Sequence, residues 1–229
     1  MGAVYPTIPH RPRSMRVRRS RGGSGGRSGG PSHNNTGVNT GVVRIIAGRW
    51  RGRKLVFPAQ PGLRPTGDRL RETLFNWLQP LLPDARCLDL FAGSGALGLE
   101  AASRGAALVS LIESSAAAAQ ALRDNCARLE ADGVEVVNTD ALAWLARRSP
   151  PPDPYYTIAF LDPPFASDLL RRAIPALEAS GVLAVPAWIY LETALGQAIP
   201  ELPQNWHLHR EKCSGDVCCR LFRRAPRAI

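Results

Sequence analysis

From Arg86 onward, short apolar runs alternate with longer stretches in which apolar residues recur at helical spacing. The apolar runs are rich in Val, Ile, Leu and Phe and predict buried strands over residues 87–91, 107–113, 134–140, 156–162 and 187–193. The stretches between them predict helices at about 95–104, 115–131, 141–148 and 168–179. Buried strands that alternate with helices indicate an α/β fold with a doubly wound, mostly parallel sheet.

Three more elements flank this alternating region. Two β-prone runs, residues 42–48 and 53–57, surround a glycine-bounded turn and predict a small N-terminal β-hairpin. Residues 68–82 gather their apolar side chains on one face, as an amphipathic helix does. Near the C-terminus, residues 206–213 and 217–224 predict an antiparallel hairpin. The pattern therefore predicts a seven-stranded sheet that closes with an antiparallel hairpin and has a β-hairpin extension at its N-terminus.

Composition divides the chain into three parts. Residues 1–41 are rich in Arg, Gly, Ser, Pro and Asn and cannot bury apolar surface, which predicts a disordered tail. Residues 42–62 form the basic hairpin, and residues 63–225 form the α/β domain. The tail either contacts RNA or has no function, and it is an upstream artefact if translation begins at Met15. Its glycines disfavour a further possibility, an organelle transit peptide, because they spoil an amphipathic helix.

Charge is distributed unevenly along the chain. The formal net charge is +10, which favours a polyanionic partner. Residues 1–41 hold no acidic residue, so the rest of the chain carries only +3. The tail's seven basic residues are Arg11, Arg13, Arg16, Arg18, Arg19, Arg21 and Arg27.

Cysteine usage and hydropathy suggest a cytoplasmic protein. The five cysteines include no CxxC pair, and a bridge between adjacent Cys218 and Cys219 would be strained, so we expect reduced thiols. No apolar run approaches the roughly 20 residues that a membrane span needs, and no secretory signal precedes the domain. The four histidines form no ligand set, so we expect no metal. We also expect a monomer.

The segment from Asp89 to Gly98 is the first candidate site. It follows an apolar strand, opens a helix and matches the GxGxxG pattern through Gly93 and Gly95. Glycines let the backbone approach a ligand closely, and a helix start offers free N–H groups. The Asp89 carboxylate would repel a pyrophosphate but suits the cationic amine of a methionine moiety. The segment therefore favours S-adenosylmethionine over a dinucleotide.

Two more acids follow later strands. Glu113 ends the strand over 107–113 and is expected to accept hydrogen bonds from both ribose hydroxyls, a role it could equally play toward NAD. Asp140 ends the strand over 134–140 and is expected to accept one from the adenine amine, or to cap the next helix, or to do both. The predicted cofactor site is completed by Phe91, Ser114 and Ala141.

The sequence Asp162-Pro163-Pro164-Phe165 directly follows another strand. Two prolines fix a rigid loop at the crevice where α/β folds bind ligands, although the same residues also make a good turn. Methylation of an exocyclic base amine requires that its lone pair be localised. The Asp162 carboxylate and the Pro163 carbonyl would do this by accepting the amine hydrogens, and Asp162 would take the released proton. Phe165 would stack on the extruded base.

These motifs together resemble the class I amino-methyltransferases, which have a Rossmann-like fold, bind S-adenosylmethionine and carry an [Asp/Asn/Ser]-Pro-Pro-[Phe/Tyr/Trp] motif. RIIAGRWRGRKL, LRPTGDRLRETLFNWL, LDLFAGSGALGLEAASRGA and WHLHREKCSGDV are similar to a narrower bacterial group, the 16S rRNA guanine-N2 methyltransferases of subfamily D. The resemblance spans about residues 43–224. It implies methylation of guanine 966 in the small ribosomal subunit or a late assembly particle. The tail and Cys218-Cys219 depart from the family pattern.

Two groups of residues are candidates for contact with RNA. Arg49, Arg51, Arg53 and Lys54 surround Trp50, a combination that suits phosphate contact and base stacking, or simply a solvated edge hairpin. The family resemblance further implies that three residues line the mouth of the active site, although they also read as a linker and a helix start: Arg64, Thr66 and Arg69.

Three other functions compete with this interpretation. A DNA adenine-N6 or cytosine-N4 methyltransferase shares the mechanism, but residues 43–224 leave little room for a target-recognition region. A Rossmann NAD-dependent oxidoreductase needs a separate substrate domain, which this length does not provide. A noncatalytic RNA-binding protein would not need the intact acids and the Asp-Pro-Pro-Phe loop.

Overall fold

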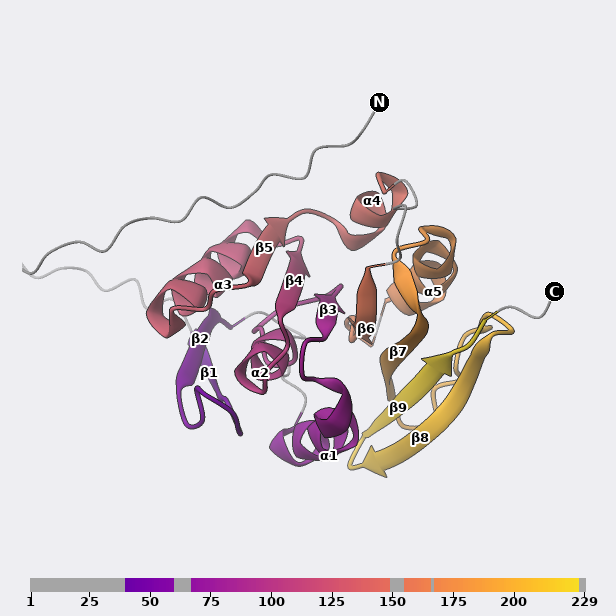
Figure 1. The fold of residues 1–229 in the computed structure, drawn as a ribbon, viewed down its shortest axis with the longest axis horizontal. Coiled ribbons are helices and arrows are strands. Elements are labelled where there is room, and N and C mark those ends of the chain that lie inside the picture. Colours follow the sequence, from indigo (N-terminus) through magenta and orange to yellow (C-terminus); the bar gives the residue numbers. More distant parts are fainter. Residues whose placement is uncertain (1–39, 60–66, 149–154, 166, 227–229) are drawn as a thin grey trace, which may run out of the picture. The chain divides into compact units, whose positions relative to one another are not determined.

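The strands expected from the apolar runs form the central sheet of the computed structural model, which describes residues 40–59, 67–148, 155–165 and 167–226. The strand order is β5-β4-β3-β6-β7-β9-β8, as Figure 1 shows. Neighbouring strands pair in parallel from β5 to β7, whereas β9 runs antiparallel to both β7 and β8. The predicted fold class is confirmed. The seven strands are β3 (Arg86–Asp89), β4 (Leu108–Glu113), β5 (Val134–Asn138), β6 (Tyr156–Leu161), β7 (Leu183–Ala194), β8 (Trp206–Ser214) and β9 (Val217–Arg224).

Helices pack on both faces of this sheet, and each face has its own apolar cluster. One cluster contains Leu74 and Phe75 of α1 with Leu99 of α2. The other contains Trp144 of α4 and Ile174 of α5. The sheet is therefore doubly wound, as buried strands with apolar side chains on both faces require. The helices are α1 (Asp68–Leu78), the 3-10 turn η1 (Gln79–Leu81), α2 (Gly98–Ser103), α3 (Ala116–Leu129), α4 (Ala141–Ala146) and α5 (Leu169–Ala179).

Several element boundaries differ from the sequence prediction, and two of them differ for a clear backbone reason. Helix α2 begins at Gly98 rather than near residue 95, because Gly95 has a φ of +78° and belongs to the preceding loop. Strand β7 begins at Leu183 rather than Ala187. Pro186 hid this early start because it interrupts the apolar run, and the pairing of β7 with β6 shifts register between Tyr156 and Ile158.

The N-terminal hairpin consists of β1 (Thr40–Arg44) and β2 (Lys54–Pro58), which pair in a separate antiparallel sheet. Strand β1 begins two residues before the predicted start of the hairpin. The hairpin lies against α3, where Asn125 accepts from the Val56 N–H and donates to its carbonyl. The disordered tail was predicted over residues 1–41, but Thr40 and Gly41 belong to β1, so that boundary is wrong; residues 1–39 lie outside the described residues.

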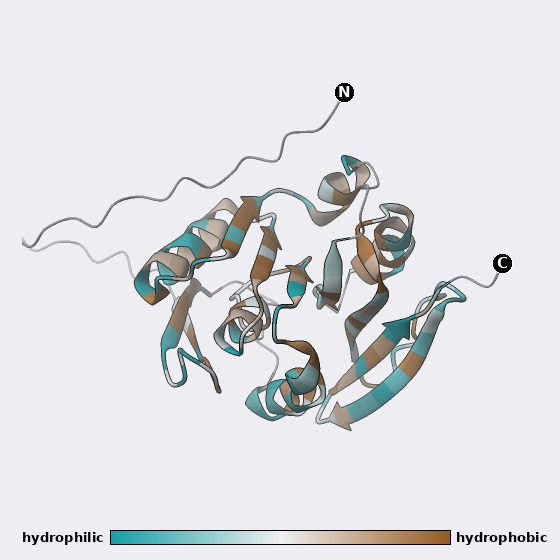
Figure 2. Cartoon of the chain, in the orientation of Figure 1, coloured by the Kyte–Doolittle hydropathy of each residue, from teal (hydrophilic) through white to brown (hydrophobic). Residues whose placement is uncertain are grey.

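The C-terminal hairpin is fixed to α5 by a polar cluster around Glu178. Its carboxylate accepts from the Arg224 guanidinium at 2.8 and 2.9 Å and from the Trp206 indole at 2.9 Å. Strand β8 is the edge of the sheet and is largely polar, in contrast to the brown central strands of Figure 2. None of the helices in the described ranges is both long and apolar enough to cross a membrane.

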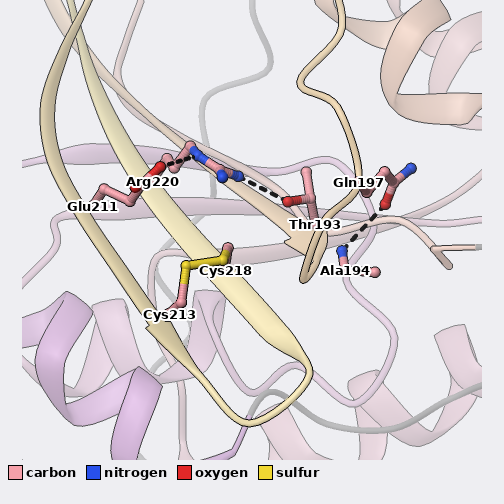
Figure 3. Close-up of a disulfide and its surroundings, with 7 residues drawn as sticks. All are labelled: Thr193, Ala194, Gln197, Glu211, Cys213, Cys218 and Arg220. Atoms are coloured by element: carbon pink, nitrogen blue, oxygen red, sulfur yellow. Dashed lines mark hydrogen bonds and ion pairs between the residues drawn. A yellow bond between two sulfur atoms is a disulfide. The ribbon is translucent and has the colours of Figure 1, made fainter.

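The expectation that all cysteines are reduced thiols is wrong for one pair. Cys213 of β8 and Cys218 of β9 form a disulfide across the hairpin (Figure 3). The sequence drew attention to adjacent Cys218 and Cys219, but antiparallel register places Cys218 opposite Cys213 instead. Neighbours along a strand point to opposite faces, so Cys219 turns away and stays a buried free thiol.

Candidate active site

Three of the predicted acids lie together at the carboxyl ends of neighbouring strands. Asp89 ends β3, Glu113 ends β4, and Asp162 directly follows β6. Because β3 pairs in parallel with both β4 and β6, the carboxyl ends of the three strands are neighbours. The chain order reverses between β3 and β6, and such a switch point opens a crevice for ligands.

Two of these acids hold the glycine-rich loop in place. Glu113 accepts hydrogen bonds from the backbone N–H groups of Gly93 at 2.8 Å and Ser115 at 2.7 Å. Asp89 accepts one from the Gly98 N–H at 3.0 Å. A Cβ at Gly98 would come within 2.2 Å of the Leu111 side chain, so only glycine lets the start of α2 lie this close to β4.

Asp89 also has an unmatched oxygen that fits a cationic ligand. The residue is 1% exposed, and its Oδ1 atom has no hydrogen-bond partner among the described residues. Burial raises the pKa of this carboxyl to about 7; the Gly98 and Phe91 N–H groups oppose the rise, and the Glu113 charge adds to it. A buried carboxylate needs a partner, and the ammonium group of a methionine moiety would supply one. The site therefore fits S-adenosylmethionine.

The third predicted cofactor acid, Asp140, caps a helix. It accepts a hydrogen bond from the Ala143 N–H at 2.8 Å at the start of α4, so the capping alternative is confirmed. The carboxylate is exposed and retains further acceptor capacity, so its contact with adenine stays a prediction. The same holds for Glu113 and the ribose. Of the remaining predicted residues, Phe91 is half-buried, Ser114 is exposed and Ala141 is buried.

The Asp-Pro-Pro-Phe loop is rigid and partly open. The Pro164 carbonyl accepts from both the N–H and the hydroxyl of Ser167, which closes a turn. Pro163 is buried and Asp162 half-buried, while Phe165 is 38% exposed. An exposed aromatic ring beside a fixed carboxylate is suited to holding a flat base.

A second carboxylate beside this loop was missed by the sequence analysis. Glu192 of β7 is 3% exposed and lines a small depression together with the loop residues Pro163 and Phe165. It accepts a hydrogen bond of 2.6 Å from the Tyr190 hydroxyl. Burial and the charges of Glu192 and Asp162 raise the pKa of Tyr190 well above its usual value, so this phenol stays neutral and acts as a donor. Sequence analysis could have found Glu192 as a charged residue within the otherwise apolar run of β7.

The basic hairpin is exposed, but its aromatic residue is not. Arg49, Arg51, Arg53 and Lys54 all reach solvent. Trp50 is 7% exposed and packs in the apolar cluster, with the Arg49 guanidinium 4.0 Å from its ring centre. The prediction that Trp50 stacks on a base is therefore wrong, because its indole contributes to the attachment of the hairpin.

The last residue of helix α2 holds the hairpin tip. Ser103 accepts from the Arg49 N–H through its carbonyl and from the Trp50 N–H through its hydroxyl. Helix α2 starts beside Asp89, at the carboxyl end of β3, and the chain after it leads to the amino end of β4. Ser103, at the end of α2, therefore lies toward the amino ends of the strands. The tip therefore lies at the edge away from Asp162.

Glu100 and Arg71 form a second attachment for the hairpin, which the sequence analysis also missed. The buried Glu100 carboxylate accepts from the N–H groups of Ile46 and Ala47 and pairs with Arg104 at 2.7 Å. Arg71 of α1 lies 3.9 Å from it and donates to the Arg44 carbonyl. The signal was a charged residue within the apolar sequence ALGLEAA.

The remaining predicted RNA residues belong to the start of α1. Arg71 faces Glu100 and Gln79 faces Arg104, so α1 runs alongside α2 in the same direction. Its first turn, with the exposed Arg69, is thus the end nearer the acids. Arg64 and Thr66 lie outside the described residues.

Comparison with known proteins identifies the family. A family model described as Conserved hypothetical protein 95 matches residues 43–223. Ribosomal RNA small subunit methyltransferase D of Escherichia coli (strain K12) is 52% identical over 194 residues, which cover 85% of this chain and 94% of that protein. Its counterpart in Haemophilus influenzae is 45% identical over 184 residues, covering 80% and 94%. The chain belongs to the family of ribosomal RNA small subunit methyltransferase D.

Solved structures agree with this assignment. The yhhF protein of Escherichia coli superimposes with a TM-score of 0.74 at 50% identity, covering 82% of this chain and all of that one. An RNA methyltransferase from Salinibacter ruber, solved with S-adenosyl-L-homocysteine, shares the fold with a TM-score of 0.55 at 15% identity. The methyltransferase D family is a class I family, so the prediction of an rRNA methyltransferase that uses S-adenosylmethionine is confirmed.

Within the part of the chain that the structure describes, no three His, Cys, Asp or Glu residues are grouped to hold a metal ion. The acids instead serve the loop and the predicted cofactor contacts.

Proposed function

We propose that this enzyme methylates the exocyclic N2 amine of guanine 966 in 16S rRNA of the small ribosomal subunit. The observation that carries the proposal is the position of Asp162. It follows β6, the parallel neighbour of β3, whose last residue is the cofactor acid Asp89. The proposed sites for the methyl donor and for the methylated base therefore lie in one crevice.

The residues of the loop supply what transfer to an aromatic amine requires. The amine lone pair is delocalised into the ring and is a poor nucleophile. The Asp162 carboxylate and the Pro163 carbonyl accept hydrogen bonds from its two N–H groups, which localises the lone pair on nitrogen. S-adenosylmethionine, when bound, supplies a methyl group on a positively charged sulfur. As the N–C bond forms and the S–C bond breaks, the amine loses one proton, which Asp162 accepts.

The hairpin supports a large, folded RNA as substrate. Its basic tip lies at the edge of the sheet away from Asp162, so it would contact phosphates remote from the methylated base. Phosphate contacts fix register without reading sequence, and a structured loop can present an unstacked guanine at low cost. We therefore propose a small subunit or late assembly particle in the cytoplasm as the substrate. Arginines of residues 1–41 would add to the phosphate contacts. We also propose that the active form is a monomer.

The test uses small subunits from cells that lack the enzyme, incubated with labelled S-adenosylmethionine beside deproteinised rRNA and unmethylated duplex DNA. We expect the particle to be the best substrate and N2-methylguanine to be the labelled nucleoside. Label on adenine N6 or cytosine N4, or equal incorporation into DNA, would instead favour a DNA amino-methyltransferase.

A further inference from the structure

The depression beside the Asp-Pro-Pro-Phe loop contains acceptors from two different elements. It is shallow, with room for about one water molecule. Pro163, Pro164 and Phe165 come from the loop, whereas Glu192 and Gln197 come from the end of β7 and the turn after it. A base stacked on Phe165 with its amine at the loop would have the Glu192 carboxylate beside a neighbouring part of its ring.

The position of Glu192 is held from several sides. The Tyr190 hydroxyl donates to its Oε2 atom at 2.6 Å. The next residue, Thr193, accepts from Arg220 of β9 at 2.8 Å, and Arg220 also pairs with Glu211 of β8. Figure 3 shows Arg220 between Thr193 and Glu211, with the Cys213–Cys218 disulfide on the same hairpin. The end of β7 is thus joined to β9 and, through Arg220, to β8, which suits a residue that discriminates by geometry.

The three candidate bases differ at the ring atom beside the reactive amine. In guanine this atom, on the Watson–Crick edge, is N1, which carries a hydrogen; N3, on the other side of the amine, carries none. In adenine it is N1 and in cytosine N3, and each presents a lone pair. An ionised carboxylate only accepts hydrogen bonds, so it attracts the guanine edge and repels the other two.

We propose that Glu192 is the residue that selects guanine, by accepting the N1–H hydrogen bond of the extruded base. This inference rests on the proposed function, because it assumes that the guanine N2 amine lies at Asp162. It adds a reason why the same loop that serves adenine and cytosine in other amino-methyltransferases acts here on guanine. Tyr190 is a positioning residue, since its hydroxyl orients the Glu192 carboxylate.

The experiment replaces the target guanine with 2-aminopurine, which keeps the 2-amine but has a lone pair at N1. Small subunits are reconstituted on ligated rRNA that contains either base, and kcat/KM is measured for each. We expect the full-length enzyme to prefer guanine by at least about tenfold, since a site built for a donor rejects an analogue without it. In Glu192→Gln, the Tyr190 hydroxyl would hold the amide oxygen and turn the amide N–H toward the base. Activity on guanine should fall about 10- to 100-fold, and the preference should shrink or reverse.

Two controls separate this role from a structural one. Glu201→Gln removes a carboxylate from an exposed loop and should leave the preference unchanged. Tyr190→Phe keeps the ring but removes the donor, so it should narrow the preference even if Glu192→Gln folds poorly. Equal losses on both bases, or a wild-type enzyme that does not distinguish them, would overturn the role of Glu192. If the guanine particle yields no N2-methylguanine with the wild-type enzyme, the proposed function itself fails.

Discussion

The Oε2 atom of Glu113 accepts a hydrogen bond of 2.8 Å from the backbone N–H of Gly93. The last residue of β4 therefore shapes the loop that follows β3, while its other oxygen holds Ser115 at the start of α3. A residue expected to contact the ribose thus also fixes the loop around the cofactor, because a carboxylate has more acceptor positions than these two N–H groups fill.

This double role makes Glu113→Ala a sensitive test of the cofactor site. The variant loses charge-assisted hydrogen bonds of about 1.5–3 kcal/mol each, so affinity for S-adenosylhomocysteine should fall at least about tenfold. Glu113→Gln keeps one acceptor oxygen and should lose less. Isothermal calorimetry measures both, and unchanged affinity in Glu113→Ala would refute the assignment.

Cofactor binding should depend on pH through Asp89, whose pKa burial raises to about 7. A cationic amine favours the ionised carboxylate, so binding lowers this pKa and releases a proton. Affinity should rise with pH by at most tenfold per unit up to about pH 7 and then level off. Asp89→Asn should bind more weakly, with no such rise. A flat profile for the wild-type enzyme between about pH 5 and 8 would contradict the Asp89 contact.

Asp162→Ala should slow methyl transfer strongly while leaving cofactor binding intact. The carboxylate acts on the target amine, so single-turnover rates should fall by about 10²- to 10⁴-fold. Asp162→Asn should retain more activity, because an amide oxygen still accepts one hydrogen bond. A thermal shift with S-adenosylhomocysteine confirms that each variant is folded. Near-normal turnover in Asp162→Ala would remove this residue from the mechanism.

The hairpin should contribute phosphate contacts and no chemistry. Replacing Arg49 and Arg51 together by Gln should raise KM for the particle without changing kcat at saturation. If both contact phosphates, the slope of log affinity against log salt should fall by about 1–2. The matched pair Arg171 and Arg172, exposed on α5, should have little effect when replaced in the same way. Identical slopes for the two double variants would show that the hairpin does not bind RNA.

Acid should destabilise the fold through Glu178. Burial would raise its pKa, but hydrogen bonds from Arg224, Trp206 and Asn205 lower it from 4.5 to about 2. Because the folded value lies below the unfolded one, the stabilisation is present above about pH 4.5 and is lost as pH falls toward 2. It amounts to at most about 3 kcal/mol, because solvent screens part of the interaction. Urea unfolding at several pH values should show this loss in the wild-type protein and much less of it in Glu178→Gln. Equal acid sensitivity would exclude Glu178 as its source.

The local pattern of the sequence predicted most of the elements. The alternation of apolar runs and helical stretches predicted the parallel strands and the helices between them, because each run reflects burial that depends on its own residues. Asp89, Glu113 and Asp162 were found for a related reason, since their place at strand ends follows from local sequence once the strands are parallel. Errors occurred where the backbone departs from regular geometry, at Gly95 and Pro186.

Contacts between distant segments were decided only by the tertiary structure. Trp50 sits among arginines in the sequence, yet it is buried because the hairpin folds onto α2, more than fifty residues away. Register alone places Cys213 opposite Cys218. Glu192 reads as one charge in a strand until the pairing of β6 with β7 brings its end beside the Asp162 loop. The local sequence determines on which face of its strand or helix a side chain lies. The residue that it contacts depends on how separate elements pack, and a short segment of sequence does not contain that information.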